Sequence, residues 1–260
     1  MRIATRTVVS GICAFAMAAV FAAPAGAQTA EVKEKPPMYS YIANWTLPRA
    51  SWPDFEKGAP TTQKVMEHAL ATGAIVGFGS DSRIIHAEDG NTHDNWFSGM
   101  SAAGVLNTLD ELIKAGSATS PVIASATKHS DNLMVSRYYG WHAGSWKGAY
   151  TRYSGYTLKA DAPDDAVDIL AKGFLVPLFE KLLADGTIFE YEIDLEALHT
   201  DNPAEFSFLF MAPTAESLDK VSAALTEAMK KSPFAGPSIV GFSDFAKHRD
   251  SLWRSTVTFK

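Results

Sequence analysis

A short motif that occurs twice constrains the fold of this chain more than any other feature. Residues 128–133 read Lys-His-Ser-Asp-Asn-Leu, and residues 247–252 read Lys-His-Arg-Asp-Ser-Leu, 119 positions later. Two further pairs match at a spacing of 113, namely Gly73 with Gly186 and His86 with His199. Nearly constant spacing at several points indicates an internal duplication. Each half of the chain is therefore expected to form the same structural unit.

Both halves show the same order of predicted elements, from hydrophobic periodicity and from glycine and proline positions. The first half is predicted to contain a strand at 39–47, a helix at 61–71, extended segments at 74–85 and 92–97, a helix at 101–115 and a strand at 121–127. The second half is predicted to contain a strand at 150–158, a helix at 163–184, strands at 186–195 and 205–211, a helix at 214–230 and a strand at 238–245. In each half the repeated motif then opens a trailing extended run.

A β-α-β-β-α-β unit is the split βαβ, or ferredoxin-like, arrangement. We therefore predict an α+β protein, with a first repeat at 38–140, a connection at 141–149 and a second repeat at 150–260. The helices of such a unit cover only one face of its sheet, and these strands carry aromatic rows that would favour aggregation if exposed. The simplest solution packs the two uncovered sheets against each other. The sequence does not decide which aromatic rows face the helices.

This pattern resembles the dimeric α/β-barrel superfamily in a tandem-fused form, over about residues 38–260. The resemblance rests on element order and duplication, and we match no signature motif of a member family. Members include small-molecule monooxygenases, haem-dependent enzymes such as chlorite dismutases, muconolactone-isomerase-like enzymes and stress-responsive proteins. The resemblance implies a ligand site between sheet and helices or inside the barrel.

Residues 1–27 have the pattern of a secretory signal peptide. Arg2 and Arg6 precede an apolar, alanine-rich run, and Ala25-Gly26-Ala27 is a small-residue cleavage site. The polar residues 28–37 end in two prolines and are expected to form a flexible lead-in. We therefore expect a periplasmic or secreted protein with no membrane span after cleavage.

Cysteine content and charge exclude several classes of function. Cys13 is the only cysteine and lies inside the predicted signal, which excludes thiol catalysis, iron–sulfur clusters and cysteine zinc sites in the mature chain. The net charge of −6 becomes about −8 once Arg2 and Arg6 are removed. Because no Lys/Arg-rich patch interrupts this acidic balance, nucleic acid is not an expected partner.

One pair of equivalent strands differs between the halves in a way that suggests a site. Alternation along the strand places Glu190, Glu192 and Asp194 on one face, and the first two correspond to Gly77 and Gly79. If the two sheets face each other, the glycines leave room beside the glutamates. A buried carboxylate with a raised pKa there would suit general acid/base catalysis. The alternative is a solvated strand face, with the glycines relieving a bulge.

Three ring-bearing residues complete this predicted site. His93 occurs only in the first half, where the second half has Phe206 and Phe208, and it is the third acid/base candidate. It is equally compatible with a surface histidine on an edge strand. Trp45 and Tyr156 are expected to line an apolar ligand pocket, or else to form core between the halves.

The repeated motif supplies an alternative site. Its His and Asp are two positions apart, so they share one face of a strand and the carboxylate could orient the imidazole. Another histidine would complete a metal or haem site. The structural alternative is that each pair caps backbone groups, and presence in both halves favours it. The residues of the metal hypothesis are His129, Asp131, His248, Asp250, His86 and His199.

We expect an exported protein that binds a small apolar or aromatic molecule, with no organic cofactor favoured. The alternatives are a haem or metal enzyme and a non-catalytic envelope protein. The chain lacks a glycine-rich phosphate loop, a Gly-x-Ser-x-Gly elbow and a His-Glu-x-x-His helix, which argues against several nucleotide-binding and hydrolase classes. The sequence fixes neither the ligand nor the oligomeric state.

Overall fold

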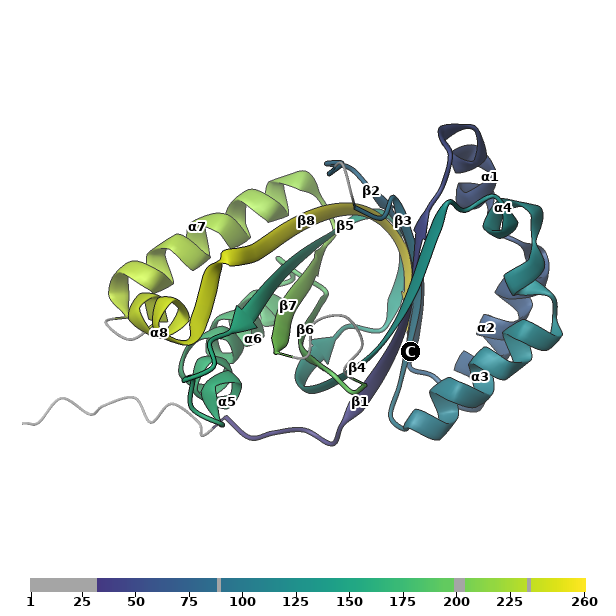
Figure 1. Cartoon of the computed structure of the whole chain (residues 1–260). Coiled ribbons are helices and arrows are strands. Elements are labelled where there is room, and N and C mark those ends of the chain that lie inside the picture. Colours follow the sequence, from purple (N-terminus) through teal and green to yellow (C-terminus); the bar gives the residue numbers. More distant parts are fainter. Residues whose placement is uncertain (1–31, 88–89, 199–203, 233–234) are drawn as a thin grey trace, which may run out of the picture. The chain divides into compact units, whose positions relative to one another are not determined.

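Eight antiparallel strands close into a barrel in the computed structural model, which describes residues 32–87, 90–198, 204–232 and 235–260 (Figure 1). The strands are β1 (Met38–Thr46), β2 (Gly77–Arg83), β3 (His93–Gly99), β4 (Lys128–Trp141), β5 (Gly144–Leu158), β6 (Glu190–Glu196), β7 (Glu205–Ala212) and β8 (Ser243–Phe259). Their order around the barrel is β1-β3-β2-β8-β5-β7-β6-β4. The barrel is closed because β4, at the end of this order, is hydrogen-bonded to β1, at its beginning.

The helices lie outside the barrel, those of the first half on one side and those of the second half on the other (Figure 1). The first half contributes η1 (Arg49–Ser51), α1 (Trp52–Lys57), α2 (Pro60–Thr72), α3 (Ala102–Lys114), η2 (Ser117–Thr119) and α4 (Pro121–Ala124). The second half contributes α5 (Ala166–Leu170), the π-helical η3 (Ala171–Leu175), α6 (Val176–Ala184), α7 (Ala215–Lys231) and α8 (Ala235–Phe242). Among the described helices, none combines the length and apolar character needed to cross a membrane.

The duplication is visible in the strand order. The first half is arranged β4-β1-β3-β2 and the second half β8-β5-β7-β6, which is the same order of equivalent strands. The two four-stranded sheets join at both edges, through the pairs β2–β8 and β4–β6. The expected intrachain dimeric α/β-barrel of two ferredoxin-like units is confirmed, and joining the sheets at their edges leaves no edge strand unpaired.

Equivalent glycines end the helices that follow the first strand of each half. Gly73 follows α2 with a φ of 78°, and Gly186 follows α6 with a φ of 76°. This left-handed conformation is readily adopted by glycine and ends a helix. The matched spacing of these two residues in the sequence therefore has a backbone explanation.

Two predicted strands were wrong. Residues 121–127 contain helix α4, which begins at Pro121 with the Ser120 side chain accepting a hydrogen bond from the backbone N–H of Ile123. Most of residues 238–245 belong to helix α8. Short apolar runs do not distinguish a strand from a buried helix, which is the reason for both errors. The trailing extended runs are the true fourth strands, so the repeated motif lies inside β4 and β8.

The stretch 141–149, expected to connect the halves, is mostly strand. Strand β4 continues to Trp141 and β5 begins at Gly144, so a short turn separates them. The mutual pairing of long antiparallel strands explains the extension, since β5 pairs with β8 from Gly144 onwards.

The face of each sheet that points towards the helices is aromatic. Beneath α2 and α3, the rings of Tyr41 and Phe97 lie 5.2 Å apart. Beneath α6 and α7, a larger core contains Tyr191, Phe206, Phe208 and Phe210 together with Phe174 and Phe179 of the helices. Burying a side chain of this size contributes about 1.5–3 kcal/mol. The rows that contain Tyr41 and Phe206 to Phe210 are thus the helix-facing ones.

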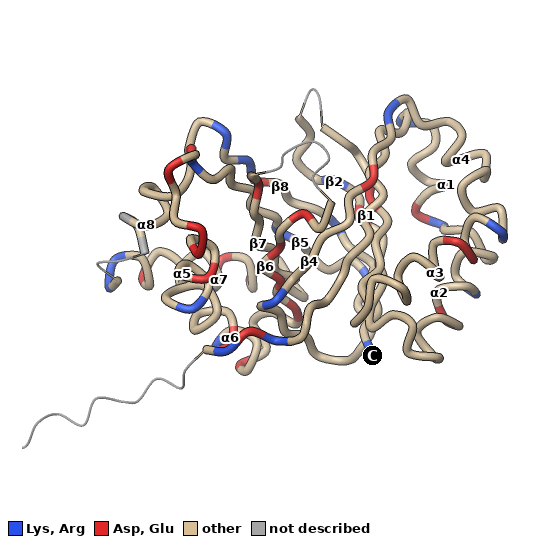
Figure 2. The backbone as a smooth tube through the Cα atoms, turned by 60° about the horizontal axis from the view of Figure 1, so that its bottom comes forward, with Lys and Arg blue, Asp and Glu red and all other residues tan. Residues whose placement is uncertain are grey.

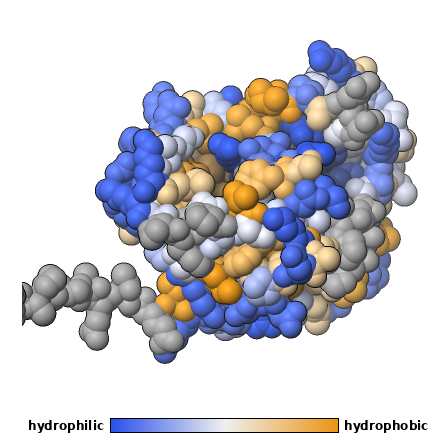
Figure 3. Space-filling model, turned by 60° about the vertical axis from the view of Figure 1, so that its left-hand side comes forward, coloured by the Kyte–Doolittle hydropathy of each residue, from blue (hydrophilic) through white to orange (hydrophobic). Residues whose placement is uncertain are grey.

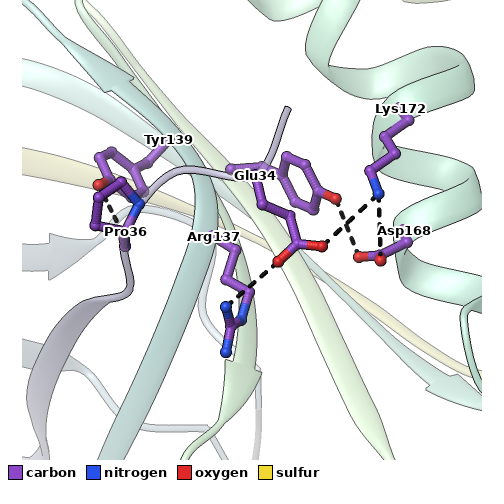
Figure 4. Close-up of polar contacts among 7 residues, drawn as sticks. Glu34, Pro36, Arg137, Tyr139, Asp168 and Lys172 are labelled. Carbon is purple, nitrogen blue, oxygen red and sulfur yellow. Dashed lines mark hydrogen bonds and ion pairs between the residues drawn. The ribbon is translucent and has the colours of Figure 1, made fainter. Parts of the chain in front are cut away.

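Residues 32–37 precede β1 and make defined contacts instead of forming only a flexible lead-in. The backbone N–H of Lys35 donates to the carbonyl of Arg137 at 2.8 Å, and the Tyr139 hydroxyl donates to the Pro36 carbonyl at 2.7 Å. Glu34 lies between Arg137 of β4 and Lys172 of η3, at 3.3 and 3.7 Å (Figure 4). Charge complementarity explains why this polar segment is held, while residues 28–31 lie outside the described part.

Candidate functional site

A cleft of about 220 Å³ opens between helix α7 and the outer face of the second sheet. Its apolar wall contains Phe210 of β7, Leu218 of α7 and Leu252 of β8. Arg152 of β5 and Asp250 of β8 supply charged groups at the same wall. The remaining lining residues are Ile85, Ser222 and Ser251. We call this space the α7 cleft.

The duplication shows which side chains differ between the α7 cleft and the equivalent place in the first half. In the first sheet, Tyr41 pairs with Phe97 across β1 and β3, and in the second sheet Arg152 pairs with Phe210 across β5 and β7. Tyr41 and Arg152 therefore occupy equivalent positions. In the first half the ring of Tyr41 packs on Phe97, whereas Arg152 supplies no ring at the equivalent place, and Phe210 lines the cleft while remaining buried in the core of the second half.

A second replacement enlarges the same space. The helix N-caps Ser101 of α3 and Thr214 of α7 are equivalent, and at that spacing Leu109 corresponds to Ser222. Leu109 packs on the core of the first half, whereas Ser222 lines the cleft. Two large packing groups are thus replaced in the second half, and both replacements border the α7 cleft.

The polar wall of the cleft is centred on the Asp250 carboxylate. It accepts hydrogen bonds from Arg152 Nη2 at 3.0 Å and from the Ser154 hydroxyl at 2.6 Å. His248 Nε2 lies 3.5 Å from the same carboxylate. In the first half, Asp131 accepts from the Tyr41 hydroxyl at 2.6 Å. The second half therefore presents a cation–carboxylate pair where the first half has an exposed phenol–carboxylate contact.

The repeated histidines stack on aromatic rings of the neighbouring first strands. The rings of His129 and Trp45 are 3.8 Å apart and nearly parallel, and those of His248 and Tyr156 are 4.2 Å apart. His129 Nε2 lies 2.9 Å from Asp131. Burial, then the charge of Asp250, raises the pKa of Tyr156 to about 12, partly offset by Arg152. Trp45 and Tyr156, predicted pocket residues, lie in these stacks on the outer face.

The metal hypothesis finds no cluster in the described part of the chain. Among the described residues no three His, Cys, Asp or Glu side chains gather where they could hold a metal ion. His129 and His248 lie in separate stacks, and His86 stacks on Trp52 with ring centroids 5.2 Å apart. His199 lies outside the described residues.

His93 is buried on the outer face beneath α1, with its ring centroid 4.5 Å from that of Phe55. Its Nδ1 lies 2.9 Å from the Thr92 hydroxyl, and its Nε2 has no hydrogen-bond partner. Burial, then the charge of His86, lowers the pKa of His93 to about 4. The next residue, Asp94, lines the barrel interior, so His93 points away from it. The structure does not bring His93 together with the predicted glutamates.

The barrel interior gathers buried carboxyl groups. Glu190, Glu192 and Asp194 share one face of β6, as alternation predicts, and Figure 2 shows β6 as an acidic stretch (red). Asp81 of β2 and Asp94 of β3 face the same interior. Burial is the largest cause of the raised pKa of all five groups, reaching about 6 for Asp81 and Asp194 and lying well above the ordinary range for the others.

The room expected beside the glutamates is largely filled. A Cβ atom on Gly79 would lie 2.6 Å from the ring of Trp96 and 2.8 Å from Val257, and one on Gly77 would meet the ring of Phe259. The glycines therefore accommodate side chains of neighbouring strands. A cavity of about 60 Å³ remains in the interior, and Glu192 lines it together with Asp81 and Asp94.

The sequence analysis missed the cleft residues Arg152 and Ser222. The detectable signal was the loss of an aromatic and of a leucine relative to the first half, at Tyr41 and Leu109. The equivalent residues are 111 positions apart in the strands and 113 in the helices, so a single spacing does not align both.

Comparisons with known proteins agree with the fold. No family model and no curated protein sequence matches the chain. Among solved structures, a proposed monooxygenase from Lactobacillus acidophilus has 13% identity and a TM-score of 0.58, covering 86% of this chain and 97% of that one. A proposed monooxygenase from Fusobacterium nucleatum has 6% identity and a TM-score of 0.63, with 87% and 95% covered. An anthrone oxidase-like protein has 10% identity and a TM-score of 0.50, with 87% and 94% covered. At these identities the likeness establishes the fold alone.

Proposed function

We propose that this protein binds a small, largely apolar or aromatic molecule in the α7 cleft. The apolar part would lie on Phe210, Leu218 and Leu252. A hydroxyl, carbonyl or similar polar group would face Arg152 and Asp250. A mostly apolar lining with a few polar groups is typical of small-molecule sites.

The observation that carries this proposal is the difference between the two halves. The same fold fills this space in the first half with Tyr41 and Leu109, and the second half replaces them with Arg152 and Ser222. Filling such a space with apolar side chains stabilises a protein, so an open cleft at one of two equivalent places lacks a stability rationale. A ligand site supplies a reason for leaving it open.

We extend the proposal to a catalytic role for the α7 cleft, which the enzyme-like proteins of this fold support. The solved structures with this fold include proposed monooxygenases and an anthrone oxidase-like protein. In the present chain, Asp250 and the neighbouring His248 are the groups at the cleft that can hold or move a proton. Cofactor-independent proton transfer to or from the bound molecule is the chemistry these residues suit.

Haem does not fit this cleft. Axial haem ligands in proteins are His, Cys, Met or Tyr side chains. None of the described residues that line the α7 cleft is of these types. His248 stacks on Tyr156, and its Nδ1–H donates a hydrogen bond to the Gly155 carbonyl oxygen at 2.9 Å. We therefore derive no step through haem.

The test is calorimetric titration of the mature protein with 1-naphthol, which has two apolar rings and one hydroxyl group. The double variant Arg152→Tyr/Ser222→Leu places residues in the cleft that match Tyr41 and Leu109 of the first half. We expect it to fold and to bind 1-naphthol at least about tenfold more weakly. Tyr41→Phe is the matched control and should bind like the wild type. Equal affinity of the double variant and the wild type would reject the site.

The N-terminal sequence supports a second part of the proposal, export from the cytoplasm. Cleavage after Ala27 would release a chain that begins at Gln28. Mass spectrometry of the protein recovered from the periplasm or medium tests this, and recovery of the full-length chain from the cytoplasm alone would reject it.

A further inference from the structure

The barrel interior holds an excess of acidic groups around a cavity. The cavity of about 60 Å³ is lined by Ser40, Ile42, Asp81, Asp94, Trp96, Ser98, Thr151, Tyr153, Glu192, Leu209, Met211 and Trp253. Three of these described lining residues carry a carboxyl group, and none carries a positive charge. This composition differs from that of the α7 cleft, where Arg152 already pairs with Asp250.

The carboxyl groups influence one another electrostatically. The charges of Glu192, Asp194 and Asp81 act on Glu190, and the charge of Asp81 acts on Asp94. Arg83, at the end of β2, opposes this by lowering the pKa of Asp94. Its guanidinium lies over the ring of Trp253 at 5.3 Å. Arg83 therefore offsets the negative charge at Asp94 only in part, because burial and the charge of Asp81 still raise the pKa of Asp94 well above its ordinary value.

Several of these polar atoms have no partner. Asp81 is 5% exposed, and while its Oδ2 accepts from Trp96 Nε1 at 2.9 Å, its Oδ1 has no hydrogen-bond partner. Both carboxyl oxygens of Glu190 and the hydroxyl of Ser207 are also buried without a partner. Leaving a buried polar atom unpaired costs about 1–3 kcal/mol, so each such atom needs an explanation.

Aromatic side chains share this cavity with the carboxyl groups. Trp96, Trp253 and Tyr153 all line it. The faces of such rings attract cations, tryptophan most strongly, and a cage of aromatic rings beside carboxylates is how proteins recognise organic ammonium groups. The same wall thus offers the two features of an ammonium site, negative charge and aromatic surface.

We propose that the barrel interior is a second ligand site, separate from the α7 cleft, that binds a small organic ammonium ion. Its charged nitrogen would be held by Asp81 and Glu192. Its carbon atoms would contact Trp96 and Trp253. The proposal does not depend on the function of the α7 cleft.

The size of the cavity limits the ligand to a few heavy atoms. A water molecule needs about 10–15 Å³ by this measure of volume, so about 60 Å³ accommodates a methylated amine but not an amino sugar. A hard metal ion would also suit oxygen groups. Among the described residues, however, no three acidic or histidine side chains gather at metal-binding geometry, and the aromatic wall adds nothing to a metal ion.

Proton NMR titration of the mature protein with trimethylammonium chloride at pH 8 tests the site. Bound methyl groups against indole faces should move upfield by ring-current shifts, which a loosely bound surface ion does not show. Neutral tert-butanol, of similar size, is the ligand control. Asp81→Asn removes one charge and should weaken binding at least about tenfold. Asp110→Asn, at an exposed position on α3, is the matched control and should leave binding unchanged.

Each outcome decides the proposal. Saturable, upfield-shifted binding that depends on Asp81 supports it. If Asp81→Asn does not fold, Glu192→Gln replaces it with the same expected loss. The proposal is overturned by an absence of saturation with a Kd of about 10 mM or tighter. Equal binding of tert-butanol, or of the wild type and both carboxamide variants, also overturns it, as does binding of Mg²⁺ or Ca²⁺ in place of the amine.

Discussion

The imidazole of His129 stacks face to face on the indole of Trp45, with ring centroids 3.8 Å apart and an interplanar angle of 5°. The second half repeats the arrangement with His248 and Tyr156, at 4.2 Å and 19°. In each half the histidine comes from the fourth strand and the aromatic from the first, and the two strands are paired. The repeated motif therefore stabilises the pairing of two neighbouring strands. This role explains its presence in both halves without a metal ion.

This explanation predicts that both histidines contribute to stability. His248→Ala should lower the free energy of unfolding by about 1–3 kcal/mol, because it loses the stack and the hydrogen bond to Gly155. His129→Ala should lose about 1 kcal/mol, because its ring is more exposed. Urea unfolding measures both. His68→Ala, at an exposed position on α2, is the control and should change little. Loss of bound zinc or cobalt in the two variants, with unchanged stability, would contradict this role.

The glycines opposite the acidic strand are predicted to be packing residues. Gly79→Ala should destabilise the protein by about 1–3 kcal/mol, because the new Cβ would meet Trp96 at 2.6 Å and Val257 at 2.8 Å. Gly241→Ala in α8 is the matched control, since nothing lies within 4 Å of a Cβ there. That control should be neutral or stabilising by up to about 1 kcal/mol. Thermal unfolding compares the two, and an undisturbed Gly79→Ala protein would mean that the space beside the glutamates is open.

Local patterns predicted most elements of the fold, and the internal duplication predicted how they combine. Gly73 and Gly186 marked equivalent helix ends, and alternation in β6 placed Glu190, Glu192 and Asp194 on one face. Both features depend only on residues close in sequence. The surroundings of these glutamates were not predictable, because Trp96 and Phe259 reach the space beside the glycines from other strands. Alternation places His93 and Asp94 on opposite faces of the strand, but it did not show which of the two faces the helices, and His93 packs beneath α1.

The α7 cleft could be predicted from the sequence only by comparing equivalent residues of the two halves, and no single spacing aligns all of them. Arg152 is recognised as unusual only when β5 is aligned on β1, and Ser222 only when α7 is aligned on α3. The side of the second half that carries α5 to α8 shows no single patch that marks a site, since hydrophobic and hydrophilic residues are interspersed over it (Figure 3). Tertiary contacts, rather than local propensity, define this site.

The contacts of residues 32–37 predict that Glu34 contributes only modestly to the free energy of unfolding. Glu34→Gln removes ion pairs with Arg137 and Lys172, at 3.3 and 3.7 Å, that are partly exposed to solvent (Figure 4). Such pairs contribute little, so the loss in unfolding free energy should be at most about 1 kcal/mol and should shrink at high salt. Glu56→Gln on α1 is the exposed control. A larger, salt-independent loss in urea unfolding would show that the segment has a greater part in folding than its ion pairs provide.

The buried carboxyl groups predict that the barrel loses stability as pH rises. Burial raises the pKa of Asp81 from 3.8 to about 6, so between these values the folded chain binds more protons than the unfolded chain. The contribution is fully present below the unfolded pKa and is lost as pH rises through about 6, which for Asp81 amounts to about 3 kcal/mol. His93 acts in the opposite direction, because its pKa is lowered to about 4 and its contribution is lost as pH falls.

Urea unfolding from pH 4 to 8 should therefore be compared between the wild type and Asp81→Asn. The difference isolates Asp81, and the variant should gain stability relative to the wild type as pH rises. A constant difference across this range would mean that Asp81 titrates alike in the folded and unfolded chains.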